Sequence, residues 1–310
     1  MSLMAADAAG ADRLSPAALP LFRELGDLKR IHSATAPGSI AERLFVSGWA
    51  ALVRGDAPAQ VMAQVVGAAL VSARLGDLDL AALQALGAGD GAVDVLARAF
   101  DAMTADLDPS LRARLRRALT QGRPTPGATP AFVGKLARQP RAGVTCPGAP
   151  RIVLQPAENH AEHCLMVAVY GVLASPWHGA DPVRVFLAGM AHHLHNADMP
   201  DSGYSGEMLL GDLLEAVIER AREASLDELA AANPALAETI REALAPIAGD
   251  QTPEARAFHV ADVLDRVLEI EQHMRAARLS MGIVLDEYGL VHDGPVKAFH
   301  DRILADAGLA

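Results

Sequence analysis

Apolar residues along this chain recur mostly with the spacing of an α-helix, and the alternation that marks a half-buried strand is rare. In the N-terminal part the pattern predicts helices over residues 40–54, 58–75, 91–105 and 109–120. In the C-terminal part it predicts helices over residues 159–175, 182–197, 205–224, 226–232, 234–247 and 253–279, and a closing helix. Pro58 and Pro109 lie near two of the predicted helix starts, where proline is favoured. The sequence therefore predicts an all-α fold.

The helical pattern is interrupted between residues 121 and 157, where prolines and glycines are frequent. This stretch predicts at most a short helix over 130–138 and a brief strand at 151–154. We therefore expect an N-terminal helical domain over 1–120, a connection over 121–157 and a second domain over 158–310. A short extended pair is expected after residue 280.

Composition favours a large buried core and argues against polyanionic partners. Hydrophobic residues make up 51% of the 310 residues, which is enough for one large helical domain or two smaller ones. The formal net charge of -11 disfavours binding to nucleic acid or to an anionic membrane. The sequence shows no export signal, and no apolar run reaches the roughly 20 residues that span a bilayer. We therefore expect a cytoplasmic protein, and whether it forms a homodimer is left open.

Three histidines directly follow an almost wholly apolar run, VRVFLAGMA, that would suit a protein core. They are His192, His193 and His195, in the stretch AGMAHHLHNAD. Burying an imidazole without a partner costs free energy. A hydrogen bond explains a single core histidine, but a cluster of three needs a further explanation.

Polar residues occupy apolar surroundings on two other predicted helices as well. His160 and His163 are three residues apart and so share a helix face. Asp262 stands between apolar neighbours, where a carboxylate is costly to bury unless a cation meets it. Imidazoles from two helices and a carboxylate from a third form a set that suits a divalent transition metal.

The order of these residues resembles that of the HD-domain metal-dependent phosphohydrolases: a histidine, an adjacent His-Asp pair after an apolar run, and a distant helical aspartate. The branch that includes the bacterial 5′-deoxynucleotidases is similar in its segments E-x-x-A-E-H and A-D-x-L, which residues 158–163 and 261–264 match. The resemblance covers about residues 155–280 and implies an HD-domain helical bundle. It implies that the metal ligands are His163, His192, His193 and Asp262, with His160 and His195 as substrate-binding or pocket residues.

Two residues depart from the family's pattern. His193 stands where the family has the aspartate of its pair, and Asn196 stands where many members carry a glutamate that positions or deprotonates water. If the helix over 182–197 is unbroken, Asn196 points towards the metal, but its amide cannot act as a general base. Asp198 and Asp201 in the following loop are the alternative catalytic carboxylates. The resemblance therefore implies weak activity unless one of these aspartates acts as the base.

An adjacent histidine and aspartate, the pair that the family's pattern contains, occur twice later in the chain, at His292-Asp293 and His300-Asp301. The first directly precedes a predicted Gly-Pro turn, and the second lies near the chain end without a later helical aspartate to complete a ligand set. Both pairs are expected to be surface residues.

The reaction that the resemblance implies is hydrolysis of a small phosphomonoester, for which a nucleotide is one candidate. Three imidazoles and one carboxylate favour zinc, iron, cobalt or nickel over magnesium, which prefers oxygen ligands, and manganese is a further candidate. One alternative is a non-catalytic regulator that binds a metal or a nucleotide, which the two departures favour. Another is an iron oxygenase, but no histidine lies between His195 and His259 to supply further ligands.

A segment of the N-terminal part is similar in sequence to the histidine-bearing segments. Residues 41–43 align with 161–163, and Pro58 aligns with Pro182. In the same alignment, residues 68–69 (Ala-Ala) fall opposite His192 and His193. Either the first copy is a degenerate repeat that has lost its metal ligands, or two alanine-rich helix pairs align by chance.

Overall fold

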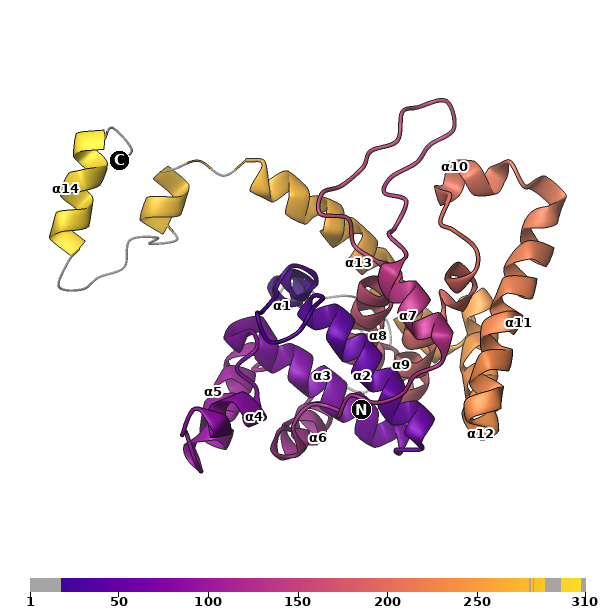
Figure 1. Ribbon diagram of the computed structural model, residues 1–310, viewed down its shortest axis with the longest axis horizontal. Coiled ribbons are helices and arrows are strands. Elements are labelled where there is room, and N and C mark those ends of the chain that lie inside the picture. Colours follow the sequence, from indigo (N-terminus) through magenta and orange to yellow (C-terminus); the bar gives the residue numbers. More distant parts are fainter. Residues whose placement is uncertain (1–17, 279, 281, 288–296, 308–310) are drawn as a thin grey trace, which may run out of the picture. The chain divides into compact units, whose positions relative to one another are not determined.

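Helices form almost the whole of the computed structural model, which describes residues 18–278, 280, 282–287 and 297–307 (Figure 1). The first part of the chain forms α1 (Leu19–Gly26), η2 (Asp27–Lys29), α2 (Ile40–Arg54), α3 (Pro58–Leu75), α4 (Leu80–Ala85), α5 (Gly91–Met103), α6 (Pro109–Ala118) and η3 (Leu119–Gln121). Then follow α7 (Ala131–Arg138), α8 (His160–His178), α9 (Pro182–Ala191), η4 (Leu194–Ala197), α10 (Gly203–Met208), η5 (Gly211–Leu213), α11 (Leu214–Ala232), α12 (Pro234–Leu244), η6 (Ala245–Ala248), α13 (Pro253–Ala276), η7 (Ile283–Glu287) and α14 (Lys297–Ala307). Within these residues no strand forms, so the predicted all-α fold is confirmed.

The break expected between helices over 205–224 and 226–232 was wrong, because α11 runs from Leu214 to Ala232 without interruption. Three further local predictions were wrong. The helix expected over 182–197 ends as an α-helix at Ala191, and residues 194–197 form the 3₁₀ turn η4. The strand expected at 151–154 is reduced to one isolated bridge between Val144 and Ile152. In the region expected to be an extended pair, residues 283–287 form the π-helical turn η7. Each error falls at the end of an element or outside the strongly periodic segments, where the local pattern is weakest.

The described residues divide into two units, one ending at Arg266 and one beginning at Val267. The second unit contains the end of α13 together with η7 and α14. His300 and Asp301 are exposed on α14, as predicted, whereas His292 and Asp293 lie outside the described residues. No helix among the described residues is both long and apolar enough to cross a membrane.

Helix α8 lies at the centre of the first unit, because residues 160–175 are buried on every face of the helix. It packs against α9 and α2, while α7 contacts α2, α8 and α11 (Figure 1). Gly189 allows the closest approach of α9 to α8, since a Cβ there would lie 2.5 Å from Ala168 Cα. The part of the predicted connection that forms α7 is therefore packed into the helical unit, and the division into domains at 121–157 stays a prediction.

The N-termini of α2 and α8 are capped in the same way and bind each other reciprocally. Ser39 and Asn159 are the N-caps, and Glu42 and Glu162 stand three residues later. Ser39 Oγ donates to Glu162 Oε1 at 2.5 Å, and Asn159 Nδ2 donates to Glu42 Oε2 at 2.8 Å. Such an exchange between equivalent positions is expected of a tandem repeat. It supports the duplication, which stays a prediction.

In the first half an ion-pair network surrounds the residue that aligns with His163. Arg43, the counterpart of His163 in the alignment, donates to Asp77 Oδ2 at 2.8 Å, and Arg123 donates to Asp77 Oδ1 at 2.6 Å. Ser33 and Thr35 also donate to this carboxylate. Although burial raises the pKa of Asp77, its hydrogen bonds with Arg43, Ser33 and Arg123 hold that pKa well below its usual range. The network therefore ties the loop before α2 to the end of α3.

We expect Asp77→Asn to lower the free energy of unfolding by about 2 kcal/mol at pH 7, the size of a lost set of charged hydrogen bonds. Because the folded-state pKa of Asp77 lies below that of the unfolded chain, this stabilisation is present above about pH 4 and is lost as the pH falls through the folded-state pKa. Urea unfolding at several pH values measures the difference between variant and parent. Asp56→Asn, which breaks a pair with exposed Arg54, is the control and should cost little. Equal losses in both variants would contradict the prediction.

Candidate metal centre

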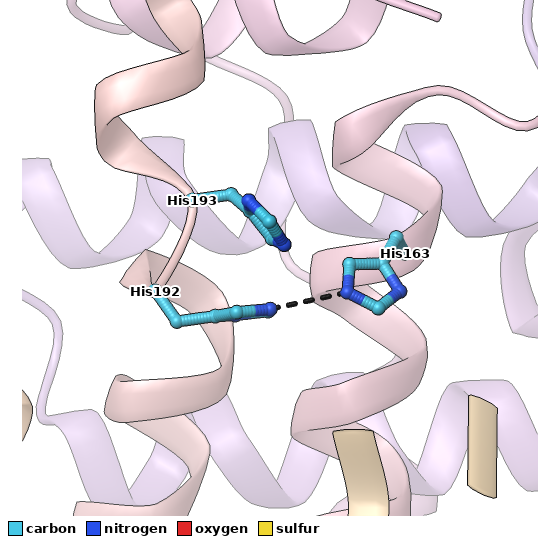
Figure 2. Close-up of side chains that lie close together, drawn as sticks. All are labelled: His163, His192 and His193. Carbon is cyan, nitrogen blue, oxygen red and sulfur yellow. Dashed lines mark hydrogen bonds between the residues drawn. The ribbon is translucent and has the colours of Figure 1, made fainter. Parts of the chain in front are cut away.

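Three histidines from two neighbouring elements converge on one point in the first unit (Figure 2). His163 lies in the first turn of α8, while His192 and His193 directly follow the end of α9. One ring nitrogen of each lies within 4.8 Å of those of the other two. The Nε2 atoms of His163 and His192 are 3.2 Å apart. The structure thus brings together three of the four residues that the sequence predicted as ligands.

The far nitrogen of His163 contacts a carboxylate. His163 Nδ1 lies 2.7 Å from Asp265 Oδ2, and both side chains are buried. Burial raises the pKa of Asp265, but the Lys29 charge and the His163 hydrogen bond outweigh burial and lower it to about 2. An ionised carboxylate only accepts hydrogen bonds, so Nδ1 of His163 is the donor, and the neutral form of this imidazole has its lone pair on Nε2.

The other two histidines are oriented in the same way by neutral acceptors. His192 Nδ1 donates to the carbonyl oxygen of Gly189 at 2.8 Å. Asn196 Nδ2 donates to the carbonyl oxygen of Met199 at 3.1 Å, which turns Asn196 Oδ1 towards His193 Nδ1 at 2.6 Å. Since Oδ1 can only accept, His193 also carries its proton on Nδ1. The Nε2 atoms of His163 and His192 therefore face the point of convergence, while Nε2 of His193 also accepts from Arg141 Nη1 at 3.4 Å.

This donor set fits one transition-metal ion. Two lone pairs facing each other at 3.2 Å repel unless a proton or a cation lies between them. A proton on His192 or His193 is disfavoured, because burial and the neighbouring His163 lower the pKa of His192 to about 3, and burial holds the pKa of His193 well below its usual value. Zinc–nitrogen bonds of about 2.0–2.1 Å in a tetrahedral site place two nitrogens about 3.3 Å apart. The observed spacing is close to that value.

Asp262, the fourth predicted ligand, lies at the edge of the histidine group. Its Oδ1 is 3.4 Å from His163 Nε2, and its Oδ2 is 3.1 Å from Arg266 Nη2. Burial raises the pKa of Asp262, but His163 and His192 together with Arg266 hold it well below the usual range. Asp262 is therefore an ionised carboxylate within reach of the same centre.

Asn196 does not point towards the metal position, contrary to the expectation from an unbroken helix. Because the α-helix ends at Ala191, residue 196 lies in η4 and its amide is engaged by His193 and Met199. The side chain is buried and both of its polar groups have partners. Asn196 thus orients the imidazole of His193. A carboxylate could accept the same hydrogen bond, but it could not donate to the carbonyl oxygen of Met199.

The two aspartates that the sequence analysis named as alternative catalytic carboxylates lie in different surroundings. Asp198 is exposed and pairs with Lys135 Nζ at 2.8 Å. Asp201 is mostly buried, accepts from the backbone N–H groups of Ala142 and Gly203, and has its Oδ2 3.5 Å from His160 Nε2. Burial raises the pKa of Asp201, but these hydrogen bonds outweigh it and lower the pKa well below its usual range. Asp201 is therefore the one of the two that lies beside the histidines.

His160 and His195 flank His193, with ring centroids 4.8 Å and 5.4 Å from its ring. Burial lowers the pKa of each to about 4, so both imidazoles are neutral at pH 7. Apart from the Asp201 contact, the ring nitrogens of His160 have no hydrogen-bond partner among the described residues. These two histidines form part of the wall around the three convergent ones.

Sequence reasoning missed several charged residues at the centre: Lys29, Arg141, Glu158 and Asp265. Arg141 lies in the predicted connection, where no helical period marks it, and its Nη1 is 3.4 Å from His193 Nε2. Asp265 could have been found, because it follows Asp262 by three residues and so shares its helix face.

A comparison with known families matches the HD domain to residues 133–288, just over half of the chain. The chain belongs to the HD domain family. The matched segment holds every residue that the sequence analysis assigned to the site, from His160 to Asp262. No curated protein and no solved structure matches the chain.

If Asn196 orients a metal-binding imidazole of this HD domain, Asn196→Ala should weaken metal affinity by about 10–100-fold, as is usual when the hydrogen-bond partner of a ligand is removed. Asn196→Glu would introduce a longer, charged side chain that cannot donate to Met199, so we expect it to weaken binding as well. Competition with a chromophoric chelator measures the affinities. Asn233→Ala is the control, because that amide is also engaged on both sides but caps α12. An unchanged affinity in Asn196→Ala would contradict the assignment.

Proposed function

We propose that this protein is a metal-dependent phosphohydrolase that cleaves a small phosphomonoester, with a nucleotide as the leading candidate substrate. The observation that carries the proposal is the convergence of three histidine Nε2 atoms whose Nδ1 atoms all donate to other groups. His163, His192, His193 and Asp262 would hold one divalent ion. The proposed resemblance to the 5′-deoxynucleotidase branch supports a nucleotide substrate.

The donor set is rich in nitrogen, which favours zinc, iron, cobalt or nickel over magnesium, and manganese is a further candidate. Such an ion, when bound, polarises a phosphoryl oxygen and acidifies a water molecule. The chain supplies hydrogen-bond acceptors for each Nδ1, so that Nε2 carries the lone pair of the neutral imidazole, and burial keeps His192 and His193 neutral. Both conditions are needed before a histidine can act as a ligand.

Arg141 would bind the phosphate. Its guanidinium can only donate hydrogen bonds, and its planar fork suits phosphate oxygens. Its Nη1 lies 3.4 Å from His193 Nε2, and its Nε lies 3.8 Å from Asp201 and 4.0 Å from Glu158. The two carboxylates therefore keep the guanidinium beside the histidines, so that a chain of net charge -11 offers a local positive group to an anion.

His160 and Asp201 would handle the proton of the attacking water. His160 is neutral at pH 7 and so can accept a proton, and Asp201 is ionised and can stabilise the imidazolium that results. The contact between Asp201 Oδ2 and His160 Nε2, at 3.5 Å, supports this pairing. In this arrangement no general base is required at residue 196.

A non-catalytic regulator that binds a metal or a nucleotide is the second candidate. The engagement of Asn196 with His193 and Met199 favours it, because no carboxylate stands at the position where many HD phosphohydrolases have one. Metal-free protein should be supplied with each candidate ion and tested on a panel of phosphomonoesters that includes 5′-deoxynucleotides. Hydrolysis that stops on chelation supports the enzyme, whereas a retained metal without hydrolysis of any substrate would favour the regulator.

If Asp201 and His160 act together, Asp201→Asn should lower kcat by about 10²-fold, at the lower end of what proton transfer contributes, with little change in metal content. Asp198→Asn removes a carboxylate of the same loop that pairs with Lys135, and we expect kcat to change by less than about twofold. Steady-state phosphate release and elemental analysis of both variants check this. A larger loss in Asp198→Asn than in Asp201→Asn would show that the base lies in the exposed part of the loop.

A further inference from the structure

A second group of possible metal ligands lies on the far side of His163. The side chains of Glu158, His163 and Asp265 bring ligand atoms within 4.8 Å of one another. Lys29 Nζ, however, donates to Glu158 Oε2 at 2.7 Å and to Asp265 Oδ1 at 2.8 Å. The side chains of Lys29, Glu158 and Asp265 are only 3%, 9% and 1% exposed. An ammonium group thus lies between two buried carboxylates beside the candidate centre.

Lys29 is held in this position by packing. It ends η2, directly after α1, and the neighbouring Leu25 and Leu28 are fully buried. Tyr170 of α8 donates its hydroxyl proton to the Phe22 carbonyl at 2.6 Å, and the two rings meet edge to face at 4.9 Å. Tyr170 stands two turns after His163 on the same helix. Helix α8 therefore positions both the imidazole and, through α1, the amine.

The buried carboxylates of Glu158 and Asp265, whose oxygens lie within 4.8 Å of each other, need a positive charge. Burial and mutual repulsion both disfavour their ionised forms. Carboxylate oxygens are also good ligands for divalent cations. The ammonium group and a divalent ion would compete for the same oxygens of Glu158 and Asp265. The amine belongs to the chain and is fixed in place, so it has no binding entropy to lose.

We propose that the Lys29 ammonium is a built-in counter-cation that takes the place of a second metal ion, so that the centre binds one ion and not two. Asp265 divides its oxygens accordingly, with Oδ1 on Lys29 and Oδ2 on His163. Lys29 is thus also a positioning residue, since it fixes the carboxylate that orients His163. The inference rests on the proposed function only for the first ion; the exclusion of a second follows from the contacts of Lys29.

The test measures the metal content of the full chain by elemental mass spectrometry, after dialysis against excess Mn²⁺ or Zn²⁺ and gel filtration. We expect one ion per chain in the parent and two in Lys29→Met, a side chain of similar length without charge. Lys29→Arg keeps the charge and should stay at one. Lys135→Met is the matched control: Lys135 also bridges two carboxylates, of Asp198 and Glu228, but is 32% exposed. It should leave the ratio unchanged.

The double variant Lys29→Met/Asp265→Asn removes one negative charge together with the positive one, so we expect it to return to one ion. Thermal unfolding gives a readout independent of activity: Mn²⁺ should raise the Tm of Lys29→Met more than that of the parent. A Lys29→Met protein that binds no more ions than the parent, two ions in the parent, or a Lys29→Met protein that stays unfolded with metal would each overturn the proposal. A parent that binds no ion beside a Lys29→Met that binds one would instead refute the proposed function and support this inference.

Discussion

Two imidazole nitrogens face each other at the centre of the first unit, and much of the surrounding structure maintains that contact. The Nε2 atoms of His163 and His192 are 3.2 Å apart, and burial lowers the pKa of His192, so that this imidazole does not readily take up a proton. The close approach of α9 to α8 at Gly189 places the two side chains together. The same glycine's carbonyl oxygen fixes the tautomer of His192. A cation at this point would relieve the repulsion between the two nitrogen lone pairs.

The acceptors that orient the three imidazoles come from different elements. Asp265 belongs to α13, Gly189 to α9 and Asn196 to the turn η4. Assembly of the centre therefore requires all of these elements to dock around α8. The first half takes part as well, because its η2 supplies Lys29 to Asp265 and its α2 exchanges capping contacts with α8. In this arrangement the N-terminal half supports the site through these contacts.

The two departures from the family's pattern are physically connected. An imidazole at residue 193 can offer Nε2 to a metal only if an acceptor takes the proton on Nδ1. Asn196 provides that acceptor, and its own donor is used by the carbonyl oxygen of Met199 in the same turn. The end of α9 at Ala191 makes this geometry possible. The histidine and the asparagine therefore act as one hydrogen-bonded unit in this structure.

The sequence by itself determined the all-α fold, the bounds of most helices and the histidines that gather on α8 and after α9, because periodicity and capping are local properties of the chain. It also determined the resemblance to the HD family. Tertiary structure alone decided which groups orient those histidines and which aspartate faces them. Lys29 reaches Asp265 across 236 residues and Glu158 across 129, and no local pattern encodes such a contact. These partners are chosen by the packing of distant helices, since a buried charge must find its counter-charge wherever the fold brings one near.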